Sequence, residues 1–191
     1  MRLIAIGIGA IALTGSSHSR MDLSSTLSAD EILVPPPRYA RLMSLGFDAA
    51  VADYYWMRAV QLSGNFETAP ERSIAEMMEV VTTLNPWVDH PYRFAAVWLT
   101  GSPQIVERAN QILERGIAYH PLDWRNRYHL GFNQFFYLER PLLAAETLEG
   151  TIGLAGSPRY LPRLVARLRS SHGGIETAAA FLRQLVGTTE D

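Results

Sequence analysis

The sequence predicts an all-α fold built from consecutive pairs of antiparallel helices. Residues that start or stop helices divide the chain beyond residue 38 into eight helical segments. The breaks between these segments are short and leave no room for a strand. A period of 34 or 35 residues separates small residues in alternate segments, and such a period is typical of helix-turn-helix repeat arrays. These small residues are Ala75, Ala109, Ala144 and Ala178.

The first 17 residues have the order of a secretory signal. Arg2 precedes the uncharged run Leu3 to Leu13, and the small polar residues 14–17 follow it. As a helix the run would span about 16 Å, roughly half of a hydrocarbon core of about 30 Å. The pattern fits both a cleaved signal and a retained membrane anchor, and either one places the folded part in the periplasm or outside the cell.

The run from Gly7 to Ala12 also fits the loose glycine-rich fingerprint of dinucleotide-binding folds. That fingerprint works only inside a strand-helix-strand unit. The stretch that leads to Glu31 is rich in serine and shows no such pattern. We therefore favour the export signal over a nucleotide site.

Four segments follow from the composition along the chain. Residues 1–17 form the signal peptide or anchor, and residues 18–38 form a tether rich in serine and proline. Residues 39–187 form the helical-repeat domain, and residues 188–191 form a tail.

Each of the first seven predicted helices starts at a capping side chain or at a proline in its first turn. Thr68 and Glu71 match the capping box, in which each side chain accepts a hydrogen bond from the other residue's backbone N–H. In chain order the start signals of the first seven helices are Asp48, Thr68 with Glu71 around Pro70, Asp89, Ser102 with Pro103, Asp123, Pro141, and Ser157 with Pro158. Gly173 and Gly174 separate the seventh helix from the eighth, which ends at Gly187.

The fifth and sixth helices carry a resemblance to a known family. Leucines follow the last three alanines after four residues, on the same helix face. The segment resembles the tetratricopeptide consensus through Trp124, Tyr128, Leu130-Gly131, Phe135, Ala144, Leu148 and Pro158.

Residues 39–191 are also similar to a group of uncharacterised exported bacterial tetratricopeptide proteins. This resemblance implies a right-handed superhelix of about four antiparallel helix pairs, in which the first helix of each pair lines a concave partner-binding face. It implies no substrate. The residues that carry it are Leu45-Gly46-Phe47, Ala52-Asp53, Trp56, Pro91-Tyr92, Leu130-Gly131-Phe132 and Leu161-Pro162-Arg163.

Composition and motifs exclude several classes of function. A formal net charge of −2 provides no basic field for nucleic acid, so we expect no nucleic-acid partner. The chain has no cysteine, which removes disulfides, thiolate metal sites and cysteine nucleophiles. The five histidines lack zinc-like spacing, and no hydrolase or phosphate-loop motif occurs. We therefore predict no catalytic residue, no metal and no cofactor.

Two polar series are candidate binding surfaces. Arg125, His129 and Asn133 recur every four residues on the fifth helix, where the resemblance places the concave face. An ordinary solvated face explains them equally well. The second series, Arg159, Arg163 and Arg167, forms a basic face that suits an acidic peptide, a lipid headgroup or a carboxylate.

Two further features favour structural roles. Asp53 has apolar and aromatic neighbours in the sequence, so we expect it to be partly buried beside an arginine such as Arg58. Most of the aromatic residues track the starts and middles of helices at the repeat spacing, and we assign them to the core.

The leading prediction is a non-catalytic scaffold of the bacterial cell envelope that binds a peptide segment or a protein subunit through its concave face. The alternative is a structural or assembly subunit of a larger membrane complex, anchored by an uncleaved N-terminal helix. A hydrolytic enzyme on a helical scaffold is a third hypothesis, and the missing motifs argue against it.

Overall fold

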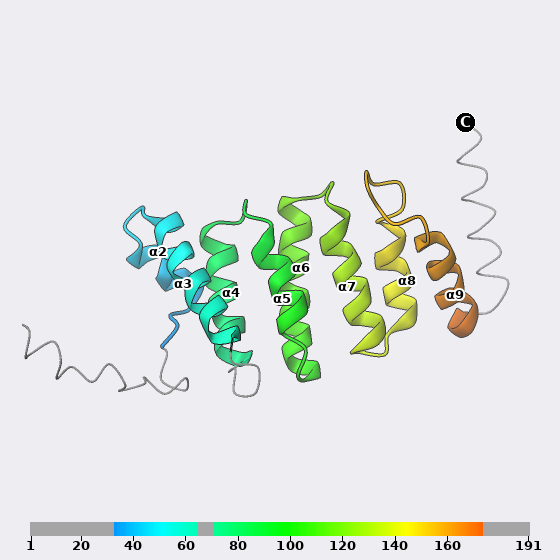
Figure 1. Cartoon of the computed structure of the whole chain (residues 1–191), viewed down its shortest axis with the longest axis horizontal. Helices are drawn as coiled ribbons and strands as arrows, with labels where there is room; N and C mark the ends of the chain where they lie inside the picture. Colours follow the sequence, from blue (N-terminus) through cyan, green and yellow to red (C-terminus); the bar gives the residue numbers. More distant parts are fainter. Residues whose placement is uncertain (1–32, 65–70, 174–191) are drawn as a thin grey trace, which may run out of the picture. The chain divides into compact units, whose positions relative to one another are not determined.

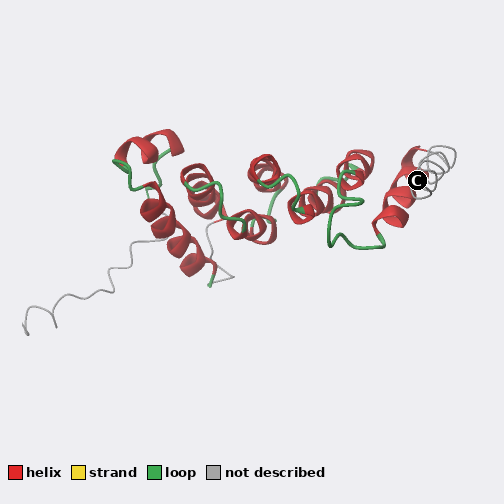
Figure 2. Ribbon diagram, turned by 90° about the horizontal axis from the view of Figure 1, so that it is seen from above, coloured by secondary structure: helices red, strands yellow, loops and turns green. Residues whose placement is uncertain are grey.

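The computed structural model describes residues 33–64 and 71–173, and every regular element in these ranges is a helix (Figures 1 and 2). The prediction of an all-α fold is therefore confirmed for this part of the chain. The helices are α2 (Pro37–Met43), α3 (Asp48–Ser63), α4 (Glu71–Leu84), α5 (His90–Trp98), α6 (Pro103–Tyr119), α7 (Trp124–Phe136), α8 (Pro141–Glu149) and α9 (Leu161–Gly173).

Several predictions lie outside the described residues. These are the signal or anchor, residues 18–32 of the tether, the Thr68 cap, the eighth helix with Ala178, and the tail. In the described ranges no helix is long and apolar enough to cross a membrane.

Three start signals are confirmed. The Ser102 hydroxyl accepts a hydrogen bond from the backbone N–H of Ile105 at 3.3 Å, which caps α6. The Asp123 carboxylate accepts from the backbone N–H of Arg125 at 3.1 Å, which caps α7. Pro141 occupies the first turn of α8, where its missing N–H costs no helical hydrogen bond.

Helix α2 contradicts the predicted end of the tether. Residues 37 and 38 are assigned to the tether by composition, yet the helix begins at Pro37. A proline at the first helical position has a suitable φ and lacks only an N–H that has no helical acceptor. The last of the three consecutive prolines, Pro37, is therefore the first residue of α2.

The prediction of a helix start at Ser157 and Pro158 is wrong. Helix α9 begins at Leu161, and residues 158–160 form a turn in which the N–H of Leu161 bonds to the carbonyl of Pro158 at 3.2 Å. Pro162 explains the shift. A proline deeper inside the helix would break a hydrogen bond, so the helix starts where Pro162 falls in its first turn.

The Glu71 carboxylate has partners outside its own helix, while the Thr68 half of the predicted capping box lies outside the described residues. It accepts hydrogen bonds from the backbone N–H groups of Thr100 at 3.3 Å and Gly101 at 2.9 Å. The start of α4 is thereby fastened to the loop between α5 and α6. A local motif predicts only local partners, whereas this acceptor meets donors about 30 residues away.

The predicted caps at Asp48 and Asp89 also have other partners. Asp48 is the first residue of α3, and its carboxylate accepts a hydrogen bond from the Ser44 hydroxyl. Asp89 stands at the cap position of α5, but it bonds to the Arg93 guanidinium at 2.8 Å. A guanidinium donor forms a stronger, charge-assisted hydrogen bond than a backbone N–H.

Helices α3 to α8 each pack against the next helix in the chain, and Figure 1 shows α3 to α9 following one another in chain order. Several helices also pack against the next helix but one. Helix α4 also contacts α6, and α5 contacts α7. Alternate helices therefore meet one another as well as their partners.

The small residues of the repeat lie in the core. Ala75, Ala109 and Ala144 are fully buried, and Leu113 and Leu148 are buried one turn later on the same face. The predicted register of these five residues is confirmed.

Glycines allow the closest approaches. A Cβ atom on Gly131 of α7 would lie 2.6 Å from Cγ of Leu148 on α8, and one on Gly116 of α6 would lie 2.8 Å from the ring of Tyr92 on α5. Both distances are below van der Waals contact. The side chains on the facing helices therefore occupy the space that a Cβ would need.

Ala109→Leu should overpack a helix crossing and lower the free energy of unfolding by about 1 to 3 kcal/mol. Arg163→Ala, at an exposed position, should change it by less than about 0.5 kcal/mol. Urea denaturation measures both values. Equal effects would contradict the register.

Gly131→Ala should destabilise the chain by about 1 to 3 kcal/mol, because its Cβ would displace Leu148. Gly150→Ala is the matched control, since its Cβ would meet no atom closer than 3.5 Å. Thermal unfolding of the two variants should differ. A Gly131→Ala variant as stable as the control would show that the α7–α8 contact can relax.

Candidate partner-binding groove

A groove of about 280 Å³ lies between α5 and α7. Its walls are mainly apolar and aromatic, and one histidine contributes a polar group. The lining residues are Ala96, Val97, Tyr128, His129, Phe132 and Tyr137. The groove therefore combines the first helices of two successive helix pairs.

The aromatic wall continues beyond the groove along α7. Phe132 and Phe136 stack with ring centroids 5.3 Å apart, and Tyr137 meets Phe136 edge-on at 5.0 Å. Phe132 is 40% exposed and Phe136 is 61% exposed. Large apolar side chains left in solvent on a rigid helix are typical of binding sites.

Tyr128 is fixed at the edge of this wall. Its hydroxyl accepts a hydrogen bond from the Tyr160 hydroxyl at 3.1 Å, and its ring meets Trp124 edge-on at 5.7 Å. The hydrogen bond with Tyr128 and partial burial raise the pKa of Tyr160 to about 12. This contact ties the segment before α9 to the groove.

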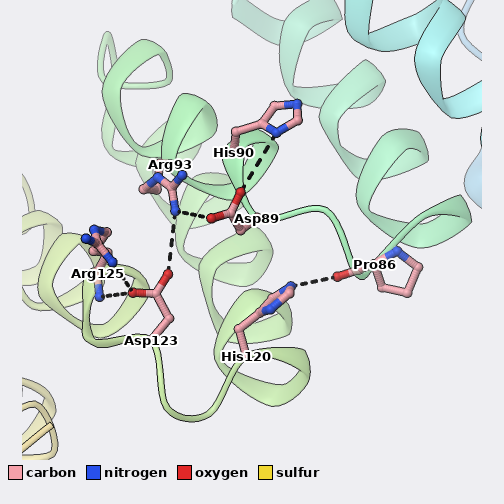
Figure 3. Close-up of polar contacts among 7 residues, drawn as sticks. All are labelled: Pro86, Asp89, His90, Arg93, His120, Asp123 and Arg125. Atoms are coloured by element: carbon pink, nitrogen blue, oxygen red, sulfur yellow. Dashed lines mark hydrogen bonds and ion pairs between the residues drawn. The ribbon is translucent and has the colours of Figure 1, made fainter. Parts of the chain in front are cut away.

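A network of charges lies at the start of α5 and α7 (Figure 3). Arg93 reaches Asp89 at 2.8 Å and Asp123 at 3.5 Å, so one guanidinium bridges the first residues of two helix pairs. Arg125 bonds to the other oxygen of Asp123 at 3.1 Å. The hydrogen bond from Arg93 holds the pKa of Asp89 below its usual value.

The carbonyl of Pro86 joins the neighbouring loops (Figure 3). It accepts a hydrogen bond from the Tyr92 hydroxyl at 2.8 Å, and His120 Nε2 lies 3.1 Å from it. Because a carbonyl can only accept, this contact requires the proton on Nε2 of His120. The loops before α5 and α7 are thereby held together.

His129 connects the charged network to the aromatic groove. Burial lowers its pKa below the usual value of 6.5, and the nearby Arg93 lowers it further, while Asp123 acts in the opposite direction. Its imidazole is therefore predominantly neutral at pH 7 and presents both a donor and an acceptor.

Of the three predicted groove residues, only His129 lines the groove. Arg125 is exposed beside Asp123. Asn133 is only 1% exposed, and its amide donates a hydrogen bond to Asn110 of α6 at 2.9 Å. Its assignment to the groove is corrected: eight residues along a helix rotate the side chain by about 80°, which turns Asn133 into the core.

The predicted basic face is accessible. Arg159 precedes α9, and Arg163 and Arg167 lie one turn apart on it; all three are exposed. Arg169, which lies nearby in the sequence, pairs with Glu149 of α8. The three exposed arginines form a surface separate from the residues that line the groove.

Asp53 is exposed, which contradicts the prediction of partial burial. Val51, Tyr54 and Tyr55 are its sequence neighbours, but side chains one or two positions apart on a helix point in different directions. The apolar neighbours therefore do not enclose the carboxylate.

Sequence reasoning missed the aromatic wall, because it assigned most aromatic residues to the core. A usable signal was present. Phe132 and Phe136 are four residues apart, so they share one helix face, while the small and polar residues Gly131, Asn133 and Gln134 occupy the buried one.

No group of three metal-binding side chains occurs in residues 33–64 and 71–173. Comparisons with protein-family models and with curated proteins give no match.

His129→Gln should flatten the pH dependence of stability below pH 6.5. A lowered pKa means that the unfolded chain binds a proton more readily than the folded one, so acidification favours unfolding. The contribution of neutral His129 to the free energy of unfolding is fully present above pH 6.5. It is lost as the pH falls towards the pKa of His129 in the folded state. Urea titrations at several pH values measure the slope, and an unchanged slope in the variant would contradict this role.

Proposed function

We propose that the helices form an α-solenoid of the tetratricopeptide type. The contacts between alternate helices, α4 with α6 and α5 with α7, support this arrangement. So does a repeated contact: the Tyr92 hydroxyl donates to the carbonyl of Pro86, and the Arg127 guanidinium donates to that of Pro121, 35 residues further on.

Within this solenoid, we propose a non-catalytic scaffold that binds a peptide segment of a protein partner in the groove between α5 and α7. The observation that carries the proposal is the exposed aromatic wall of Phe132 and Phe136 beside Tyr137. The helices that hold these rings are already folded, so a partner would lose little energy in ordering them. Recognition without turnover is the function that such a surface serves best.

The groove favours a segment with an apolar side chain next to an acidic one. The apolar group would pack against Tyr128, Phe132 and Tyr137. The acidic group would pair with Arg125, whose side chain is 52% exposed. Arg93 is less available because two carboxylates already neutralise it.

We place this function in the bacterial cell envelope, in the periplasm. The support is the export pattern of residues 1–17, which fits either a cleaved signal peptide or a retained inner-membrane anchor. An anchored chain would hold the groove close to the inner membrane.

The structural subunit of a membrane complex is the second candidate. Leu142 and Leu143 on α8 are 50% and 42% exposed, and neither lines the groove that contains Phe132. A subunit covered on several sides would use such scattered apolar residues. The groove hypothesis leaves them in solvent.

Photo-crosslinking in cells tests the two candidates. A benzophenone side chain replaces Phe132 in one variant and Leu143 in the matched control, whose native side chain is equally exposed. We expect Phe132 to capture one defined protein segment and Leu143 to capture little. Capture of the same neighbours at both positions would favour the complex subunit and contradict the groove.

Phe132→Ala supplies an independent readout. Because Phe132 is partly exposed, the substitution should cost less than about 1 kcal/mol of stability. We expect it to abolish capture by a benzophenone placed at Tyr137, and retained capture would contradict binding in the groove.

A further inference from the structure

The α2–α3 turn, taken here as the last two residues of α2 and the loop that follows (residues 42–47), holds four large apolar side chains in solvent. Leu42 is 73% exposed, Met43 71%, Leu45 85% and Phe47 73%. They fall within six consecutive residues, far from the groove between α5 and α7 in the sequence. Such a concentration of exposed apolar surface marks an interaction site.

The backbone of this turn is well fixed. The Ser44 hydroxyl oxygen lies 2.7 Å from the carbonyl oxygen of Arg41, and the Phe47 N–H donates to the carbonyl of Ser44 at 2.8 Å. Ser44 is 4% exposed, and Ala40 packs in a buried cluster with Ala52. The apolar side chains therefore project from an ordered support.

Folding does not explain the leucine at position 45. Its φ is +50°, a left-handed conformation that glycine and asparagine adopt more readily, and the next residue, Gly46, has φ +92°. An 85% exposed side chain also gains little from packing. Neither backbone conformation nor packing in the core favours leucine at this position. We therefore expect the Leu45 side chain to contact a binding partner outside the folded domain.

The segment that contains the turn is positively charged. Residues 37–47 contain Arg38 and Arg41 and no acidic residue. Both arginines are exposed, and Arg41 also donates a hydrogen bond to the carbonyl of Thr83. The first acidic residue, Asp48, already accepts a hydrogen bond from Ser44.

An apolar groove of about 330 Å³ adjoins the turn, between α2 and α3. Its polar contribution is small, and Met43 is both exposed and part of its wall. The lining residues are Pro35, Ala40, Met43, Ser44, Ala50, Val51, Tyr54 and Tyr55.

We propose that this turn docks on an anionic lipid bilayer. Leu42, Met43, Leu45 and Phe47 enter the interfacial region, and Arg38 and Arg41 remain at the level of the headgroups. The charge complementarity favours a bilayer over a second copy of the chain, since a two-fold contact at this turn would bring arginines of both copies together. The surface is independent of the partner-binding groove.

The length of the chain is compatible with this docking. Only residues 14–32 separate the uncharged run Leu3 to Leu13 from the described domain. Nineteen residues span at most roughly 70 Å. A bilayer that holds the run is therefore within covalent reach of the turn.

The full-length chain, which has no native cysteine, permits a direct test with single labelled cysteines. Leu42→Cys carries an environment-sensitive fluorophore, and Leu142→Cys, an exposed helical leucine of α8, is the matched control. The probes are vesicles of phosphatidylglycerol and phosphatidylethanolamine in equal parts, doped with nitroxide lipid. We expect a blue shift and quenching at position 42, weaker quenching in phosphatidylcholine vesicles, and little change at position 142.

Leu45→Asn separates docking from folding. Asparagine suits the positive φ, so the variant should be at least as stable as the wild type while the quenching at position 42 falls several-fold. Equal quenching at positions 42 and 142 would overturn the proposal, because tethering alone would then explain it. A concentration-dependent blue shift without vesicles would also overturn it, since a second copy would then cover the turn.

Discussion

The close approach of neighbouring helices at small residues is the constraint on which the rest of the structure depends. Ala109 and Ala144 are fully buried, and Gly131 leaves no room for even a Cβ beside Leu148. Larger side chains at these points would push the helices apart. The groove between α5 and α7 keeps its width only while these contacts hold its helices against α6 and α8.

Polar contacts also hold the helices and their connecting loops together. Glu71 fastens the start of α4 to the loop before α6, and Arg93 bridges the caps of α5 and α7. Each contact joins residues about one repeat apart. The contacts of Arg93 therefore also fix the charged end of the groove, and with it the environment of His129.

The two proposed surfaces differ in chemistry and in their relation to folding. The groove rings of Tyr128 and Phe132 have neighbours that hold them, so they resemble a preformed pocket for one side chain. The turn at Leu45 displays apolar side chains that are mostly exposed, next to the positive charges of Arg38 and Arg41. A scaffold with both surfaces would hold a protein partner near a membrane.

By itself, the sequence determined that the described part of the chain is helical. It also determined the helix starts at Ser102, Asp123 and Pro141 and the burial of Ala75, Ala109 and Ala144, because caps and periodicity depend on residues a few positions apart. Tertiary structure decided which faces remain exposed. It turned Asn133 inwards towards Asn110, left Asp53 in solvent and gave Glu71 distant partners. It also exposed Phe132 and Leu45. These outcomes depend on which helix lies opposite each side chain, and local sequence patterns do not contain that information.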